Sequence, residues 1–213
     1  LSRSSDVVSC ISSRNFDINP FTYALNTSRA LRAYDSNGER EYYTLNFAPF
    51  NILEELDNNY IKLNVIDLKA QAEFNWQIFK GLKYNFTGAI RYVRSKQEHE
   101  IHENSNMANA YRAAGNSTIR ENNPYLYKDP SDPSAAPIVV LSKGGFYNTA
   151  ENLLLNYDIR NSVSFSKIWN EKHEFNALLG QQIKYSDRQT NSTTGYGFQY
   201  DMGGTVSMNY LIM

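Results

Sequence analysis

The stretch Lys62–Phe79, KLNVIDLKAQAEFNWQIF, decides the fold class. One set of alternate positions is almost entirely apolar: Ile66, Leu68, Ala70, Ala72, Phe74, Trp76 and Ile78. The interleaved set is polar: Asp67, Lys69, Gln71, Glu73, Asn75 and Gln77. A period of two predicts one β-strand with an apolar and a polar face, because successive side chains of a strand point to opposite sides. Strands of globular domains rarely exceed ~10 residues, so this strand is unusually long.

The same design recurs along the chain. A tight turn at Lys80–Lys83 precedes a second alternating segment, Tyr84–Tyr92. In the second half, 152–165 alternates, a short turn lies around Asn170–Lys172, and 175–185 alternates after it. The sequence therefore predicts two long β-hairpins, each closed by a short turn.

The alternation also predicts which side chains share a face. We expect one continuous surface to carry Ile66, Leu68, Phe74, Trp76, Ile159 and Phe165. We expect the opposite surface to carry Lys69, Glu73, Asp158 and Arg160.

A long segment, about residues 96–150, joins the hairpins and is predicted to be an ordered outer loop. Ser105 is a suitable N-cap for a short helix that ends before Gly115. A second short helix is expected after Pro49, through Ile52, Leu53 and Leu56. Towards the N-terminus, Val7–Phe16 is a candidate strand, and 23–43 is expected to form another elaborate loop, with a tight turn at Asn37-Gly38.

Composition agrees with a β-rich chain. Aromatic residues make up 14% of the 213 residues, while charged residues make up 20% and the mean hydropathy is -0.55. The net charge of -1 gives no reason to expect a nucleic-acid partner. Cys10 is the single cysteine, which excludes a disulfide within the chain. No stretch approaches the ~20 apolar residues of a membrane helix, which leaves a β-barrel open as a way to span a membrane.

Short turns at one end of the strands and long loops at the other are typical of outer-membrane barrels. Trp76, Phe79 and Trp169 lie beside the short turns, where an interfacial aromatic girdle is expected. The sequence thus favours an all-β fold, an antiparallel transmembrane β-barrel segment with long outer loops that carry short helices. The alternative is a soluble all-β binding or interaction module whose sheet packs on a core.

Catalytic and metal motifs are weak. The run Gln97–Glu103 has its histidines three residues apart, one fewer than the zinc-protease spacing, and on a strand His99 and His102 point to opposite faces. His173 is expected in a short turn without a neighbouring nucleophile, and Gly195-Tyr196-Gly197 lacks the third glycine of a nucleotide fingerprint. We therefore predict no catalytic residue, no metal site, no cofactor and no enzymatic activity.

One loop has residues suited to ligand binding. Asn122, Asn123, Tyr125 and Tyr127 could stack on sugar rings and hydrogen-bond to hydroxyl groups, or form a protein interface. The alternative is a loop that packs its own aromatic side chains.

Several long stretches resemble SusC/RagA-type TonB-dependent transporters, outer-membrane proteins of the Bacteroidetes. They are DINPFTYALNTSRALRAYDSNGEREYYTLNFAPFNILEELDNNY (17–60), LNVIDLKAQAEFNWQIFKGLKYNFTGAIRY (63–92), EHEIHENSNMANAYRA (98–113), NNPYLYKDPSDP (122–133) and NEKHEFNALLGQQ (170–182). The resemblance covers nearly the whole chain, in order and with similar spacing.

The resemblance implies a barrel of about 22 strands that encloses a plug. Such a transporter takes up oligosaccharides or peptides, driven by the TonB complex and capped by a SusD-like surface lipoprotein. The TonB box, the plug and a terminal strand ending in an aromatic residue are not recognisable here. We therefore expect residues 1–213 to supply part of one barrel wall in the outer membrane, with lipid around it and 96–150 as an extracellular loop.

Overall fold

The computed structural model describes residues 20–28, 30–170 and 173–206, and the side chains from Tyr23 onward. It divides the chain into two compact units, which we describe separately. The strand unit comprises Leu63–Glu98 and Thr149–Ser192, and the loop unit comprises Leu1–Lys62, His99–Asn148 and Thr193–Met213. None of the helices in the described ranges is long and apolar enough to cross a membrane.

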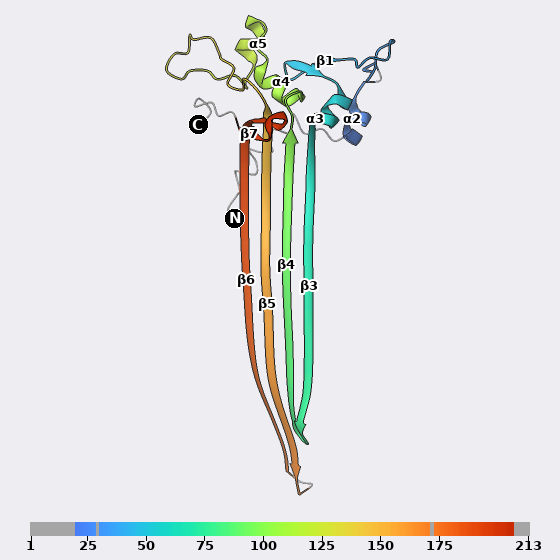
Figure 1. Cartoon of the computed structure of the whole chain (residues 1–213), viewed down its shortest axis with the longest axis vertical. Helices are drawn as coiled ribbons and strands as arrows, with labels where there is room; N and C mark the ends of the chain where they lie inside the picture. Colours follow the sequence, from blue (N-terminus) through green and yellow to red (C-terminus); the bar gives the residue numbers. More distant parts are fainter. Residues whose placement is uncertain (1–19, 29, 171–172, 207–213) are drawn as a thin grey trace. The chain divides into compact units, whose positions relative to one another are not determined.

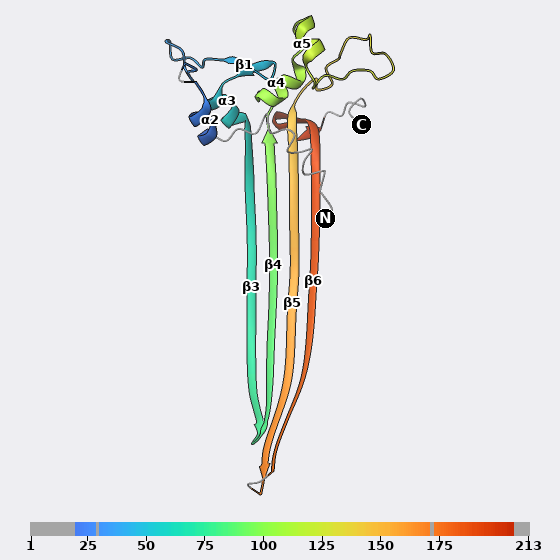
Figure 2. The same ribbon diagram turned by 180° about the vertical axis from the view of Figure 1, so that it is seen from behind.

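Four long strands form most of the structure. They are β3 (Asn59–Phe79), β4 (Leu82–Ile101), β5 (Gly145–Trp169) and β6 (His173–Gln199), with 21, 20, 25 and 27 residues. They lie side by side in chain order in a mainly antiparallel sheet, and both ribbon views show this order (Figures 1 and 2). A fifth strand, β7 (Thr205–Val206), pairs with residues 198 and 199 of β6. The two predicted hairpins are therefore present, with β5 and β6 longer than the alternating pattern indicated.

The first hairpin closes through Lys80 and Gly81, within the predicted turn. Gly81 has φ of 98°, a conformation that side-chain-bearing residues rarely adopt, and its carbonyl accepts a hydrogen bond from the Ser166 amide at 2.8 Å. In the second hairpin Asn170 forms part of the turn with φ of 52°, while Glu171 and Lys172 lie outside the described residues.

Contacts between strands join residues of the same predicted face. On the polar set, Arg91 forms a two-pronged bond to Asp67, and Asp158 accepts hydrogen bonds from Arg160 and Gln182. On the apolar set, ring contacts join Tyr157 to Tyr185, at 4.9 Å between centroids, and Phe165 to Phe175, at 6.2 Å. These contacts agree with the predicted facing of β5 and of its neighbours.

The strand unit has no buried core. None of its residues in 63–98, 149–170 and 173–192 is buried. Large apolar side chains stay open to the surroundings instead: Leu68 is 62% exposed, and Phe74 and Trp76 are each 54% exposed. The unit is a single layer of sheet whose apolar side chains are not covered by the described part of the chain.

The loop unit has its own small core. A hairpin of β1 (Tyr43–Leu45) and β2 (Ala48–Phe50) turns through Asn46 and Phe47, both with positive φ. The buried apolar cluster of the loop unit consists of Ala48, Ile101, Met107, Ala108, Ala110, Leu141 and Phe146. The cluster joins β2, the end of β4, helix α4 (Asn106–Arg112) and the start of β5, so these segments pack together.

The short helices follow the expected caps in part. Helix α3 (Ile52–Asn58) begins after the Asn51 side chain, which accepts from the Leu53 amide at 3.0 Å. Helix α4 (Asn106–Arg112) begins after Ser105, as predicted, and ends at Ala113, before the expected stop at Gly115. Two further helices, α2 (Pro20–Asn26) and α5 (Ser117–Asn122), were not expected.

Two predicted boundaries need correction. The joining loop is shorter than 96–150, because β4 continues to Ile101 and β5 already begins at Gly145. The segment 23–43 contains the end of α2 and a Tyr34–Arg40 bridge around the expected tight turn, where Gly38 has φ of 84°. The candidate strand Val7–Phe16 lies outside the described residues.

Candidate functional site

The buried side chains of Asn106 and Glu55 connect separate segments of the loop unit. The Asn106 side-chain amide donates to the carbonyls of Leu45 and Pro49 at 2.9 and 3.1 Å. Its backbone amide donates to Glu55 Oε2 at 2.6 Å. Burial raises the pKa of Glu55, although hydrogen bonds from Asn106 and Asn59 partly oppose that rise. The β1–β2 hairpin and helices α3 and α4 are thus joined by one buried hydrogen-bonded network.

A cluster of rings and charges lies where β3 and β4 end in the loop unit. The His102 ring stacks on Tyr200, with centroids 4.0 Å apart, and His102 Nε2 is 3.3 Å from the Tyr60 hydroxyl. Glu100 accepts hydrogen bonds from Tyr60 and from Lys62, both at 2.8 Å. Burial alone would raise the pKa of Glu100, but these two donors lower it overall, so the carboxylate is ionised.

Tyr200 connects three strand ends. Its hydroxyl donates to the Phe146 carbonyl at 2.7 Å and accepts from the Ile101 amide at 3.2 Å. It lies in η2 (Tyr200–Met202), the 3-10 helix that follows β6. Burial raises the pKa of Tyr200, so the phenol keeps the proton that it donates. A single side chain therefore joins the end of β4, the start of β5 and the end of β6.

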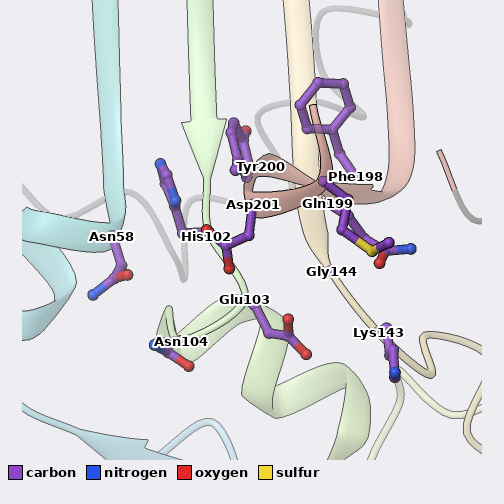
Figure 3. Close-up of a pocket in the computed structure, with 11 residues that line it drawn as sticks. Asn58, His102, Glu103, Asn104, Lys143, Gly144, Phe198, Gln199, Tyr200 and Asp201 are labelled. Atoms are coloured by element: carbon purple, nitrogen blue, oxygen red, sulfur yellow. The ribbon is translucent and has the colours of Figure 1, made fainter. Parts of the chain in front are cut away.

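An open pocket of about 480 Å³ borders this cluster (Figure 3). Its lining combines carboxylates, amides, one ammonium group and aromatic rings: Asn58, His102, Glu103, Asn104, Lys143, Gly144, Phe198, Gln199, Tyr200, Asp201 and Met202. Serine, threonine and cysteine are absent from these lining residues, so this pocket holds no Ser–His, Thr–His or Cys–His pair. The arrangement can bind a polar ligand through hydrogen bonds.

The four residues predicted to bind ligand play different roles in the structure. Asn123 is fully buried, and its side-chain amide donates to the carbonyls of Ala110 and Ala113 at 2.8 and 2.9 Å. Asn122 donates to the Thr118 carbonyl within α5, and Tyr127 pairs with Ile138 across an isolated bridge. Of the four, Asn123 therefore stabilises the loop itself.

Tyr125 is half-buried and stacks on Tyr111, with ring centroids 5.0 Å apart. Burial raises the pKa of Tyr111 to about 12. Both rings pack against the apolar cluster. This is the alternative that the sequence left open, a loop that packs its own aromatic side chains. Ligand binding by this loop stays a prediction.

The histidines of the run Gln97–Glu103 serve separate partners. His99 Nε2 is 2.6 Å from Asn59 Oδ1, whereas His102 stacks on Tyr200. Among the described residues, no group of three or more His, Cys, Asp or Glu side chains could hold a metal ion. His173 is the first residue of β6 and not part of the turn.

Sequence reasoning missed Tyr200, Glu55 and Gly145. Tyr200 and Glu55 act through partners 51 to 99 residues away along the chain. Gly145 lies so close to Ile101 that an added Cβ would be 1.8 Å from its carbonyl oxygen. No local pattern marks these residues, because each of their roles depends on strand ends that meet only in the folded chain.

Comparison with known proteins identifies no relative. A scan against models of protein families finds no match, and a search of curated proteins finds no significant match.

Proposed function

We propose that this chain forms part of the wall of an outer-membrane β-barrel, in a TonB-dependent transporter of the SusC/RagA type. The observation that carries the proposal is the strand unit, a single-layer antiparallel sheet with one polar and one apolar set of side chains and no buried residue in its described part. A soluble sheet needs a second layer over its apolar face. In a transmembrane barrel, lipid covers that face.

Charged residues bound the apolar set of β5 at both ends. From Leu153 to Phe165, every second residue is apolar except Asn161. The next member of the set is Glu151 at one end and Lys167 at the other. Glu151 is 2.5 Å from Arg94, which ends the apolar set of β4 in the same way. The apolar region therefore has the same upper limit on two adjacent strands.

The height of this region fits a bilayer. Leu153 and Phe165 lie about 40 Å apart along the strand, at ~3.3 Å per residue. A strand tilted by ~45° then spans about 28 Å, close to the ~25 Å apolar band of outer-membrane barrels. Phe175 contacts both Phe165 and Trp169 at the lower limit, where aromatic girdles lie.

The polar set would face the barrel interior. Ion pairs and hydrogen bonds such as Arg91–Asp67 and Gln182–Asp158 lie on it at the depth of the apolar region.

The two edges of the sheet also support the presence of further strands. β3 is the first strand of the sheet, and β7 covers only the last two residues of β6. Four long strands are fewer than the ~8 of the smallest closed barrels, so the proposed wall needs additional strands to close.

The transporter assignment rests on the sequence resemblance. In this role the strand unit spans the outer membrane, and the loop unit supplies extracellular loops and the pocket. The proposed partners are a SusD-like lipoprotein at the loops, the TonB complex acting through a plug, and an oligosaccharide or peptide as cargo. The chain acts as a wall and recognition element, without catalysis of its own.

The test compares the purified chain with and without detergent. We expect residues 1–213 to associate in detergent-free buffer, because exposed apolar side chains and open strand edges drive aggregation. In detergent we expect small, β-rich particles by light scattering and circular dichroism. A monodisperse monomer that unfolds cooperatively in plain buffer would refute the proposal and favour the soluble binding module.

A further inference from the structure

We propose that Lys80 and Lys167, at the short-turn end of the strand unit, bind the phosphate group of an anionic phospholipid. This inference rests on the proposed membrane orientation of the sheet. It adds a binding site on the lipid-facing side, separate from the pocket in the loop unit.

Lys167 is the first charged member of the lipid-facing set below Phe165 on β5. A lysine on the lipid face is costly at the bilayer midplane and nearly neutral at the interface, so its place beyond Phe165 is at the level of the headgroups. Its ammonium group lies 5.0 Å from the centroid of the Trp169 ring. This contact holds the charge beside an aromatic residue of the kind that prefers the membrane interface.

Lys80 reaches the same level from the first hairpin. The hydrogen bond from the Ser166 amide to the Gly81 carbonyl, at 2.8 Å, joins the turn of that hairpin to β5. Lys80 precedes Gly81, and Lys167 follows Ser166, so the two lysines flank this bond on neighbouring segments. The Phe79 and Phe165 rings, 6.5 Å apart, form the apolar floor next to them.

The two positive charges and the apolar floor match the two parts of a phospholipid. The phosphate would accept hydrogen bonds from the lysines, while the acyl chains lie along Phe79 and Phe165. A lysine near a membrane surface contributes about fivefold to the binding of acidic lipid. We therefore expect each of the two lysines to strengthen the local association of an anionic lipid by about that factor.

The experiment uses the whole chain with Trp76→Phe, so that Trp169 is the single tryptophan. Trp169 fluorescence is measured in detergent micelles that contain either brominated phosphatidylglycerol or brominated phosphatidylcholine at equal mole fraction. We expect the anionic lipid to quench at about fivefold lower mole fraction or less. Lys167→Met and Lys80→Met should each reduce this preference by about fivefold, and Lys83→Met, a matched change in the polar set, should leave it intact.

Equal quenching by the two lipids would overturn the lipid site while leaving the membrane-facing surface supported. An undiminished preference in Lys167→Met, or an equal loss in Lys83→Met, would also overturn it. The absence of quenching by either lipid would overturn both the lipid site and the proposed function, because Trp169 would then not face the apolar phase.

Discussion

Ile159→Lys is the substitution that most clearly separates a lipid-covered face from a water-covered one. Ile159 lies midway between Leu153 and Phe165, at the centre of the proposed apolar region. A lysine on the lipid face at the bilayer midplane costs about 2–4 kcal/mol. We expect the free energy of unfolding of the chain in lipid-containing micelles to fall by about that amount, measured by urea titration of tryptophan fluorescence.

Ser162→Lys is the matched control, on the same strand and in the polar set that would face the barrel interior. Its cost should stay within about 1.5 kcal/mol, because it removes one hydrogen bond, from the Asn85 side chain to the Ser162 hydroxyl at 3.5 Å. The reasoning is refuted if the two lysines destabilise the chain equally, because the two faces would then have the same surroundings.

Three further predictions concern the loop unit. Tyr200→Phe removes the acceptor for the Ile101 amide and the donor to the Phe146 carbonyl, so the free energy of unfolding should fall by about 1–3 kcal/mol. Hydrogen exchange of the Ile101 amide should speed up, and an unchanged exchange rate would contradict this role of Tyr200. Gly145→Ala places a Cβ 1.8 Å from the Ile101 carbonyl oxygen, so the free energy of unfolding in urea should fall by about 1–3 kcal/mol. A neutral effect would show that β4 and β5 do not approach this closely. Burial raises the pKa of Glu55 above 4.5, so the folded state holds this proton more tightly, and stability falls as pH rises from 4.5 through the folded pKa. Glu55→Gln should reduce that loss of stability between pH 4.5 and pH 7.5 in urea titrations, and an identical loss in both proteins would exclude Glu55 as its source.

The long hairpins could be predicted because their information is local. A period of two over Lys62–Phe79 leaves no helical face, and the glycine after Lys80 marks the turn. The predicted cap Ser105 likewise lies directly before the helix that it begins, whereas Asn51, which caps α3, was not predicted. Patterns of this kind depend on neighbouring residues alone, so the chain can be interpreted without knowledge of its tertiary contacts.

The bounds of β4 and β5 and the contacts within the loop unit could not be predicted from the sequence in the same way. The strands β4 and β5 extend past their alternating segments to Ile101 and back to Gly145, where pairing with neighbours replaces hydrophobic patterning. Asn123 was expected to bind a ligand because asparagine side chains on an outer loop can hydrogen-bond to sugar hydroxyl groups. It is buried instead, and its side-chain amide donates to the carbonyls of Ala110 and Ala113 at the C-terminal end of α4.

A nitroxide scan of β5 tests the central claim most directly. Cys10 is replaced by serine, and single cysteines are placed in turn from Leu153 to Phe165, each labelled in the chain reconstituted into lipid vesicles. Oxygen dissolves in the bilayer, so collisions of the nitroxide with oxygen should peak at the odd-numbered positions and be highest near Ile159. Collisions with a water-soluble nickel complex should peak at the even-numbered positions. Equal accessibility along the scan, or nickel access at Ile159 equal to that at Asp158, would contradict the assignment of this face to the membrane.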